Sequence, residues 1–301
     1  MDITKAFIKA KQPCADGFRW YVRHARQDST YQDILDALVA DGRVEDACWL
    51  LDQFGPTASV LAADALEAGA IVFAGTIDVR GPIGVDTVLR AGRMLRAGGG
   101  IAAGGDIRAG GDIVCGGALR SGGAIRAGGL VQAAWTIEAS CELACETLRT
   151  GGDLLCAAGA EISGDCRVGQ ALQAGGPLLC GKGVQAGADI ECGGRVRAGH
   201  GIACGGALRA AGHIAAGWGI RTRGDILAHG SIQVGESLAA EGDIRVAEGY
   251  GIYAGVEIDA HAWESCAAVH ACRRPSALRS GWWAGPLPGS AWTPASHGED
   301  R

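Results

Sequence analysis

An aliphatic residue recurs at every sixth position through most of this chain. The first run is uninterrupted and consists of Ile77, Ile83, Leu89, Leu95, Ile101, Ile107, Ile113, Leu119, Ile125, Val131, Ile137 and Leu143. One residue is then missing, and a second run with the same step extends from Leu148 to Ile244, with Tyr250 and Val256 closing the series. A fixed internal period indicates a repeat architecture, in which stacked units bury a shared core.

Each six-residue unit, or hexad, carries a small residue two positions after the aliphatic one. Clear examples are Ala97, Ala103, Ala109, Cys115, Ser121, Ala127, Cys180, Ala186, Cys192, Ala198 and Cys204. A spacing of two puts both side chains on one face of a strand. Glycine usually follows, as at Gly110 and Gly111, and the chain contains 51 Gly but only 4 Phe. We therefore expect a three-residue strand followed by a corner, where Gly supplies a positive φ.

A strand of three residues is stable only with parallel neighbours above and below it. Six residues per side predict three sides and about 18 residues per coil, with neighbouring strands about 4.8 Å apart. The predicted fold class is mainly β: a three-sided, single-strand parallel β-solenoid of about ten coils, with a small α-helical N-terminal domain.

The chain outside the repeat divides into four further segments. Residues 1–56 are expected to form a helical cap or docking domain, in which one helix begins at Thr30, with Asp33 three residues on, and ends at Asp41. A second helix is expected from Val44 to Phe54, and an earlier one around Phe18, Tyr21 and Val22. Residues 57–70 form a transition to the solenoid of residues 71–258. Residues 259–291, with Trp282 and Trp283, form a C-terminal cap, and residues 292–301 a disordered tail.

The hexads carry a family resemblance. The units Gly105–Gly110 (GDIRAG) and Gly224–Ala228 (GDILA) resemble the short-strand solenoids of bactofilins, which are polymer-forming bacterial scaffolds, over residues 71–258. They are also similar to hexapeptide-repeat acyltransferases, although there the small residue precedes the aliphatic by two and here it follows by two. The length and the N-terminal domain differ from bactofilins. No family is identified for residues 1–56.

The cysteines are expected to belong to the core. Cys115, Cys145, Cys156, Cys180, Cys192 and Cys204 occupy the small inward position, where Ala is the usual residue. The weak candidate for a metal site is a C-terminal set with zinc-compatible ligand types, consisting of His261, Cys266, His270 and Cys272. Its spacing fits no established zinc pattern, so neither a metal nor a cofactor is predicted.

Two outward-facing groups are candidates for partner binding. An 18-residue coil aligns Arg90, Arg108 and Arg126 in one ladder, whose repulsion an anionic partner or interleaved Asp would relieve. The same period stacks four corner residues, which are Lys182, His200, Trp218 and Glu236. An exposed Trp at a corner is typical of a binding hot spot, although the stack could also only stiffen the corner.

Bulk properties narrow the class of function. The formal net charge of −6 argues against a nucleic-acid binder. The sequence contains no run of 18 apolar residues and no signal peptide, and its unpaired cysteines favour a reducing, cytoplasmic location. No catalytic motif such as a P-loop or a nucleophile elbow is present, so no catalytic residue is proposed.

The leading hypothesis is a non-enzymatic scaffold or interaction protein, of a binding, inhibitor or immunity type, that acts through the solenoid flank and the helical head on a protein partner. One alternative is a bactofilin-like polymer, and another is a hexapeptide-type acyltransferase using His200, His213 or His229. Because both ends of the repeat carry extra segments, a monomer or small closed oligomer is favoured over a filament.

Overall fold

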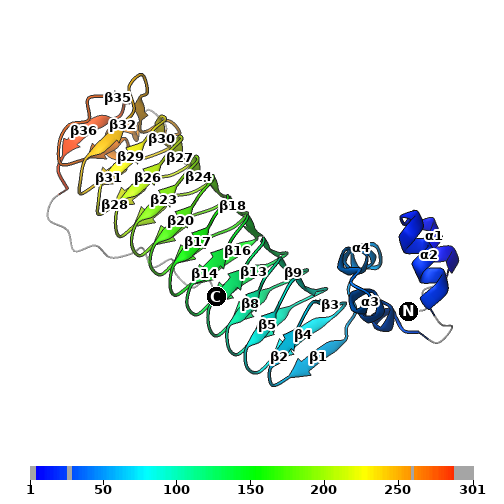
Figure 1. Cartoon of the computed structure of the whole chain (residues 1–301). Coiled ribbons are helices and arrows are strands. Elements are labelled where there is room, and N and C mark those ends of the chain that lie inside the picture. Colours follow the sequence, from blue (N-terminus) through cyan, green and yellow to red (C-terminus); the bar gives the residue numbers. More distant parts are fainter. Residues whose placement is uncertain (1–4, 26–28, 259–260, 288–301) are drawn as a thin grey trace. The chain divides into compact units, whose positions relative to one another are not determined.

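The computed structural model describes residues 5–25, 29–258 and 261–287 (Figure 1). It confirms a parallel β-solenoid with three sheets and a small helical region before the first strand. Within these residues the three sheets, which we name A, B and C, contain 13, 11 and 12 strands. The chain divides into two compact units, residues 1–140 and 141–301, which are described separately below.

The first unit begins with helices α1 (Lys5–Ala10), α2 (Ala15–His24), α3 (Tyr31–Ala40) and α4 (Val44–Phe54). Three of these were expected, and α1 is an addition. Thr30 and Asp33 form the reciprocal capping box at the start of α3. Gly42 and Gly55 end α3 and α4 with φ of 73° and 76°, a conformation that Gly adopts without strain.

The strands of the first unit follow the helices. Sheet A contains β1 (Val60–Ala63), β4 (Thr76–Val79), β7 (Leu95–Ala97), β10 (Ile113–Cys115) and β13 (Leu130–Ala133). Sheet B contains β2 (Leu66–Ala68), β5 (Ile83–Val85), β8 (Ile101–Ala103), β11 (Leu119–Ser121) and β14 (Ile137–Ala139). Sheet C contains β3 (Ile71–Phe73), β6 (Leu89–Ala91), β9 (Ile107–Ala109) and β12 (Ile125–Ala127). The first coil thus starts at Val60, inside the segment that the hexad series treats as a transition.

The strands of the second unit are likewise divided among three sheets. Sheet A contains β16 (Thr147–Thr150), β19 (Cys166–Val168), β22 (Val184–Ala186), β25 (Ile202–Cys204), β28 (Ile220–Thr222), β31 (Leu238–Ala240), β34 (Ala268–His270) and β36 (Trp282–Gly285). Sheet B contains β17 (Leu154–Cys156), β20 (Leu172–Ala174), β23 (Ile190–Cys192), β26 (Leu208–Ala210), β29 (Ile226–Ala228) and β32 (Ile244–Val246). Sheet C contains β15 (Leu143–Cys145), β18 (Ala160–Ile162), β21 (Leu178–Cys180), β24 (Val196–Ala198), β27 (Ile214–Ala216), β30 (Ile232–Val234), β33 (Ile252–Tyr253) and β35 (Leu278–Ser280).

The register confirms the 18-residue coil. Ile107 pairs with Leu89 on one side and Ile125 on the other, and the same spacing recurs in the second unit. Leu143 pairs with Ala160, one residue short of a full coil, which is where the hexad series loses a residue. The first and third residues of most strands are buried and the middle residue faces out, so the predicted facing is correct.

The expected reason for the corner glycines was wrong. Among the residues that the structure describes, positive-φ Gly occurs at six positions, and none of them is a corner of the regular hexads. A Cβ added to Gly181 would lie 2.0 Å from the carbonyl oxygen of Ser163, one coil earlier. A Cβ on Gly199 would lie 2.0 Å from the oxygen of Gly181. At Gly181 and Gly199, glycine is therefore favoured because the carbonyl of the preceding coil lies too close for a Cβ atom.

The end of the repeat also differs from expectation. Tyr250 and Val256 do not close the series, since their side chains are 45% and 51% exposed. Ile252 takes the core position instead and pairs with Ile232, 20 residues earlier, because two extra residues are accommodated in a turn that contains Gly249 at φ of 85°.

The chain after this turn adds strands to the solenoid. After the short helix α5 (Trp263–Cys266), β34 pairs with β31 and β36 pairs with β34. Trp282 and Trp283 thus belong to the last strand of sheet A, and Trp282 Nε1 donates a hydrogen bond of 2.9 Å to the Glu264 carbonyl. The predicted disordered tail, residues 292–301, lies outside the described residues. No helix in the described ranges is long and apolar enough to cross a membrane.

Candidate interaction surfaces

The four N-terminal helices α1 to α4, which we call the helical head, cover the outer edge of one sheet. Helix α3 packs against β3, which is the first strand of sheet C (Figure 1). Gln32 of α3 donates from Nε2 to the Val72 carbonyl at 3.0 Å and accepts the Ala74 N–H at Oε1 at 2.9 Å. Its side-chain amide therefore makes the two hydrogen bonds that a neighbouring strand would make. Val72 and Ala74 also join the apolar core of the head.

Replacing Gln32 with Ala should lower the free energy of unfolding by about 1–3 kcal/mol, because the Val72 carbonyl and the Ala74 N–H would lose their partners at a buried edge. Hydrogen exchange at Ala74 should accelerate, which mass spectrometry of the β3 peptide can measure. Gln173→Ala, at an exposed middle position of β20, is the matched control and should change neither quantity. Unchanged exchange in the Gln32 variant would contradict the edge-capping role.

The arginine ladder is present, and acidic groups of the chain lie beside two of its members. Arg90, Arg108 and Arg126 are consecutive partners on β6, β9 and β12. Arg90 forms an ion pair with Asp52 of α4, and Arg108 pairs with Asp106 at 2.6 Å. The Nε atoms of Arg90 and Arg108 are buried without a hydrogen-bond partner. Acidic groups of the chain thus already relieve the repulsion.

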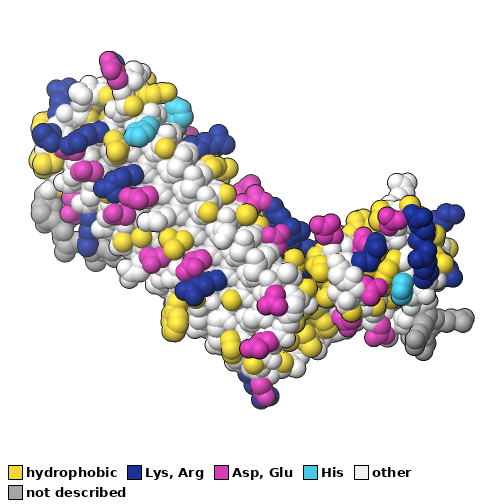
Figure 2. All heavy atoms as spheres, viewed as in Figure 1, with side chains coloured by type: hydrophobic (Ala, Val, Ile, Leu, Met, Phe, Trp, Pro, Cys, Tyr) yellow, Lys and Arg dark blue, Asp and Glu magenta, His cyan; other side chains and the backbone are white. Residues whose placement is uncertain are grey.

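The aspartates that precede the inward aliphatic residues have a structural role that the sequence did not reveal. Six of them accept, at Oδ1, the backbone N–H of the residue one coil later. The pairs are Asp106 with Ala124, Asp112 with Leu130, Asp153 with Ala171, Asp165 with Gly183, Asp189 with Ala207 and Asp225 with Asp243, at 2.7–3.1 Å. His213 occupies the same position and accepts the Ser231 N–H at Nδ1. These groups join consecutive coils, and Figure 2 shows acidic and basic side chains interspersed over the visible face.

The four corner residues stack as the period predicts. We call Lys182, His200, Trp218 and Glu236 the corner column; it lies between sheets C and A of the second unit. The rings of His200 and Trp218 are stacked, with centroids 4.1 Å apart and planes 2° from parallel. Each backbone N–H in the column bonds to the carbonyl of the column residue one coil earlier, from His200 to Lys182, Trp218 to His200 and Glu236 to Trp218. Trp218 is nevertheless 46% exposed.

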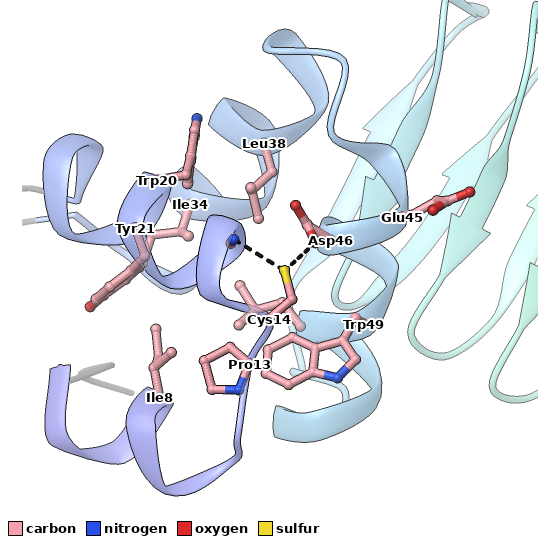
Figure 3. A pocket seen from close by; sticks show the side chains of 12 residues that line it. Ile8, Pro13, Cys14, Trp20, Tyr21, Ile34, Leu38, Glu45, Asp46 and Trp49 are labelled. Carbon is pink, nitrogen blue, oxygen red and sulfur yellow. Dashed lines mark hydrogen bonds between the residues drawn. The ribbon is translucent and has the colours of Figure 1, made fainter.

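The head contains a pocket that the sequence analysis did not predict. It has a volume of about 270 Å³ and lies between α1, α2, α3 and α4, with Ile8, Trp20 and Trp49 among its lining residues. The Cys14 thiol caps α2 by accepting the Gly17 N–H at 3.1 Å and donates to Asp46 at 4.0 Å (Figure 3). Asp46 is also held by Arg43, whereas the Glu45 side chain points away. The pocket is therefore mainly apolar.

The cysteines at the small inward position are buried, as expected. Burial raises the pKa of Cys145, Cys192 and Cys204 to about 12, and it raises the pKa of Cys115, Cys156 and Cys180 in the same direction. The Cys180 thiol donates a hydrogen bond of 2.9 Å to the Gly164 carbonyl. These thiols act as small core side chains.

Native protein at pH 7.5 should therefore react with a maleimide quickly at exposed Cys14, Cys141 and Cys272 and slowly at Cys180, Cys192 and Cys204. The reactive species is the thiolate, which a raised pKa and burial both deplete. Peptide mass spectrometry at successive times measures the rates, and labelling in urea gives the reference for full reaction. Equal rates for both groups in the native protein would overturn the core assignment.

The structure does not bring the C-terminal His and Cys set together. Strand β34 ends at His270, so Cys272 lies beyond this strand and the two side chains do not share one face of it. His270 Nδ1 lies 3.2 Å from the Gly285 carbonyl, and Cys272 is exposed. Over residues 5–25, 29–258 and 261–287, no group of three or more His, Cys, Asp or Glu is placed to hold a metal ion.

Comparison with known proteins identifies the head alone. No curated protein and no solved structure matches the chain. The comparisons give no support specific to bactofilins, and the solenoid resemblance holds at the level of fold. The sequence alone suggested no family for the head, but residues 1–55, which include α1 to α4, match the family described as the YdhT N-terminal domain.

Proposed function

We propose that this chain is a non-enzymatic scaffold for protein–protein interaction, and that the corner column is its main recognition surface. The observation that carries this proposal is the exposed Trp218 ring, stacked at 4.1 Å on His200. Tryptophan is among the residues that contribute most to protein interfaces. The stack on His200 already orders the Trp218 ring, so less side-chain entropy is lost on binding.

The head offers a second surface of a different kind. Its pocket of about 270 Å³ has apolar and aromatic walls, which suit an apolar side chain from a protein partner. Two of the three histidines considered for transferase chemistry have structural roles, since His200 stacks on Trp218 and His213 accepts the Ser231 N–H. These roles support a binding function over a catalytic one.

Site-specific photo-crosslinking tests the proposal in cells. A benzoylphenylalanine at position 218 should give discrete protein adducts, because that side chain would lie inside an interface. The same group at position 173, an exposed site in sheet B, is the control and should give none. Adducts at position 218 no stronger than at position 173 would refute the proposal.

One observation favours end-to-end polymerisation as a second candidate. Gln32 covers only the edge of sheet C, whereas β1 and β2 begin sheets A and B with no further strand of the described chain beside them. Val60 on β1 is 60% exposed. Open strand edges promote association. Filaments of the full chain at low micromolar concentration in negative-stain microscopy would favour this candidate, and discrete particles would favour the scaffold.

A further inference from the structure

The charges along the corner column are ordered so that a second, reversed copy of the column would be complementary to it. A cation, Lys182, stands at one end and an anion, Glu236, at the other, with the His200 and Trp218 rings between them. The four residues occupy consecutive coils at spacings of about 4.8 Å, so the column is about 14 Å long. Read from the opposite end, the sequence of groups is anion, aromatic, aromatic, cation.

The column is also available for contact. Lys182, Trp218 and Glu236 are exposed, and neither charged end forms an ion pair within the described part of the chain. Glycine lies on both sides of the first three column residues, as at Gly199 and Gly201. The rings therefore project from a floor without side chains, which leaves room for a second surface to approach.

We propose that the corner column binds the corner column of a second copy of this chain, with the two solenoid segments antiparallel and related by a two-fold axis between His200 and Trp218. Lys182 of each copy then faces Glu236 of the other, and each Trp218 packs on the partner's His200. This inference rests on the proposed interaction function and names its partner. A two-fold contact closes on itself and leads to a dimer instead of a fibre.

The residues beside the column fit the same arrangement. In sheet C, reversal about the axis brings Arg197 opposite Ala215, and in sheet A it brings Arg221 opposite Ala203. Each long side chain thus faces a small one, and no two like charges are placed opposite each other. A parallel arrangement would instead put Lys182 against Lys182 and Glu236 against Glu236, which is unfavourable.

Charge exchange gives a sharp test on the full chain. Sedimentation equilibrium should show a monomer–dimer equilibrium in the micromolar range, because a contact centred on four corner residues is smaller than a standard interface of about 1,600 Å². Lys182→Glu and Glu236→Lys should each weaken dimerisation at least tenfold, since two like-charge contacts arise per dimer. The double variant K182E/E236K should return to within about threefold of the original, and Trp218→Ala should weaken it at least tenfold.

Controls separate this inference from loss of folding and from the proposed function. Gln173→Glu in sheet B should leave dimerisation unchanged, and all variants should keep the thermal midpoint of the original. A monomer at 100 µM, or a double variant as weak as either single one, would overturn the second-copy inference. If position 218 then still crosslinks to a different protein, the proposed function stands with another partner. If it crosslinks to nothing, both proposals fail.

Discussion

The Ala198→Asp variant should unfold at a markedly lower denaturant concentration than the original sequence. Ala198 is the third residue of β24, and only 3% of its surface is exposed. A carboxylate there would be buried without a partner, which costs about 3–5 kcal/mol in comparable cases. Burial raises the pKa of an isolated carboxyl, so the variant should regain part of its stability as the pH falls and the group becomes neutral.

The neighbouring residue provides the control. Arg197 is the exposed middle residue of the same strand, and Arg197→Gln should change stability by about 0.5 kcal/mol or less. Arg108 is a poorer control than its outward position suggests, because it pairs with Asp106 and its Nε is buried. Urea unfolding of both variants, followed by far-ultraviolet circular dichroism, gives the comparison. Similar midpoints for the 198 and 197 variants would show that the facing of the strands is wrong.

Replacement of two glycines in the same corner by alanine should have opposite effects on stability. Gly181 and Gly183 flank Lys182, and neither has a positive φ. A Cβ on Gly181 would lie 2.0 Å from the backbone oxygen of Ser163, whereas a Cβ on Gly183 would find its nearest neighbours at 3.5 and 3.7 Å. Backbone cannot move aside as a flexible side chain can, so Gly181→Ala must push two coils apart.

The expected loss for Gly181→Ala is at or above the upper end of the ~1–3 kcal/mol that overpacking usually costs. Gly183→Ala should be neutral or stabilising by about 0.4–1 kcal/mol, because alanine restricts the unfolded chain. The same urea titration measures both variants. Equal destabilisation would point to a conformational requirement at the corner and would contradict the close approach of the coils.

The hexad period was sufficient to predict the coil, its three sides and the inward residues. Residues such as Ile107 and Ala109 are fixed by burial alone, and burial leaves a clear trace in composition. The role of corner glycines such as Gly181 was predicted for the wrong reason, because the sequence shows a preference for glycine but not whether φ or a neighbouring coil causes it. The two-residue insertion before Ile252 was missed because Tyr250 and Val256 happen to continue the apolar period.

The candidate surfaces were predicted unevenly. The stack of His200 on Trp218 followed from the 18-residue period, since residues one coil apart must be neighbours. The contacts of Gln32 with β3 and the pocket around Trp49 depend on how the helices pack, which no repeat in the sequence records. The Asp106 hydrogen bond to the next coil was missed because Asp106 precedes the strand, whereas the repeat pattern records only which strand residues face the core.

The 18-residue register positions both the core and the corner column, and engineered disulfides test it most directly. Gln173 and Glu191 are paired across neighbouring coils, so their Cα atoms are about 4.8 Å apart, within the range that a disulfide spans. Arg209 lies one coil further, at about twice that distance from Gln173, which is too far. With exposed Cys14, Cys141 and Cys272 replaced by Ser, mild oxidation of the Gln173→Cys/Glu191→Cys variant should give a cross-linked peptide by mass spectrometry. The Gln173→Cys/Arg209→Cys variant should give none. A disulfide in the second variant, or none in the first while both new thiols react with maleimide, would contradict the solenoid register.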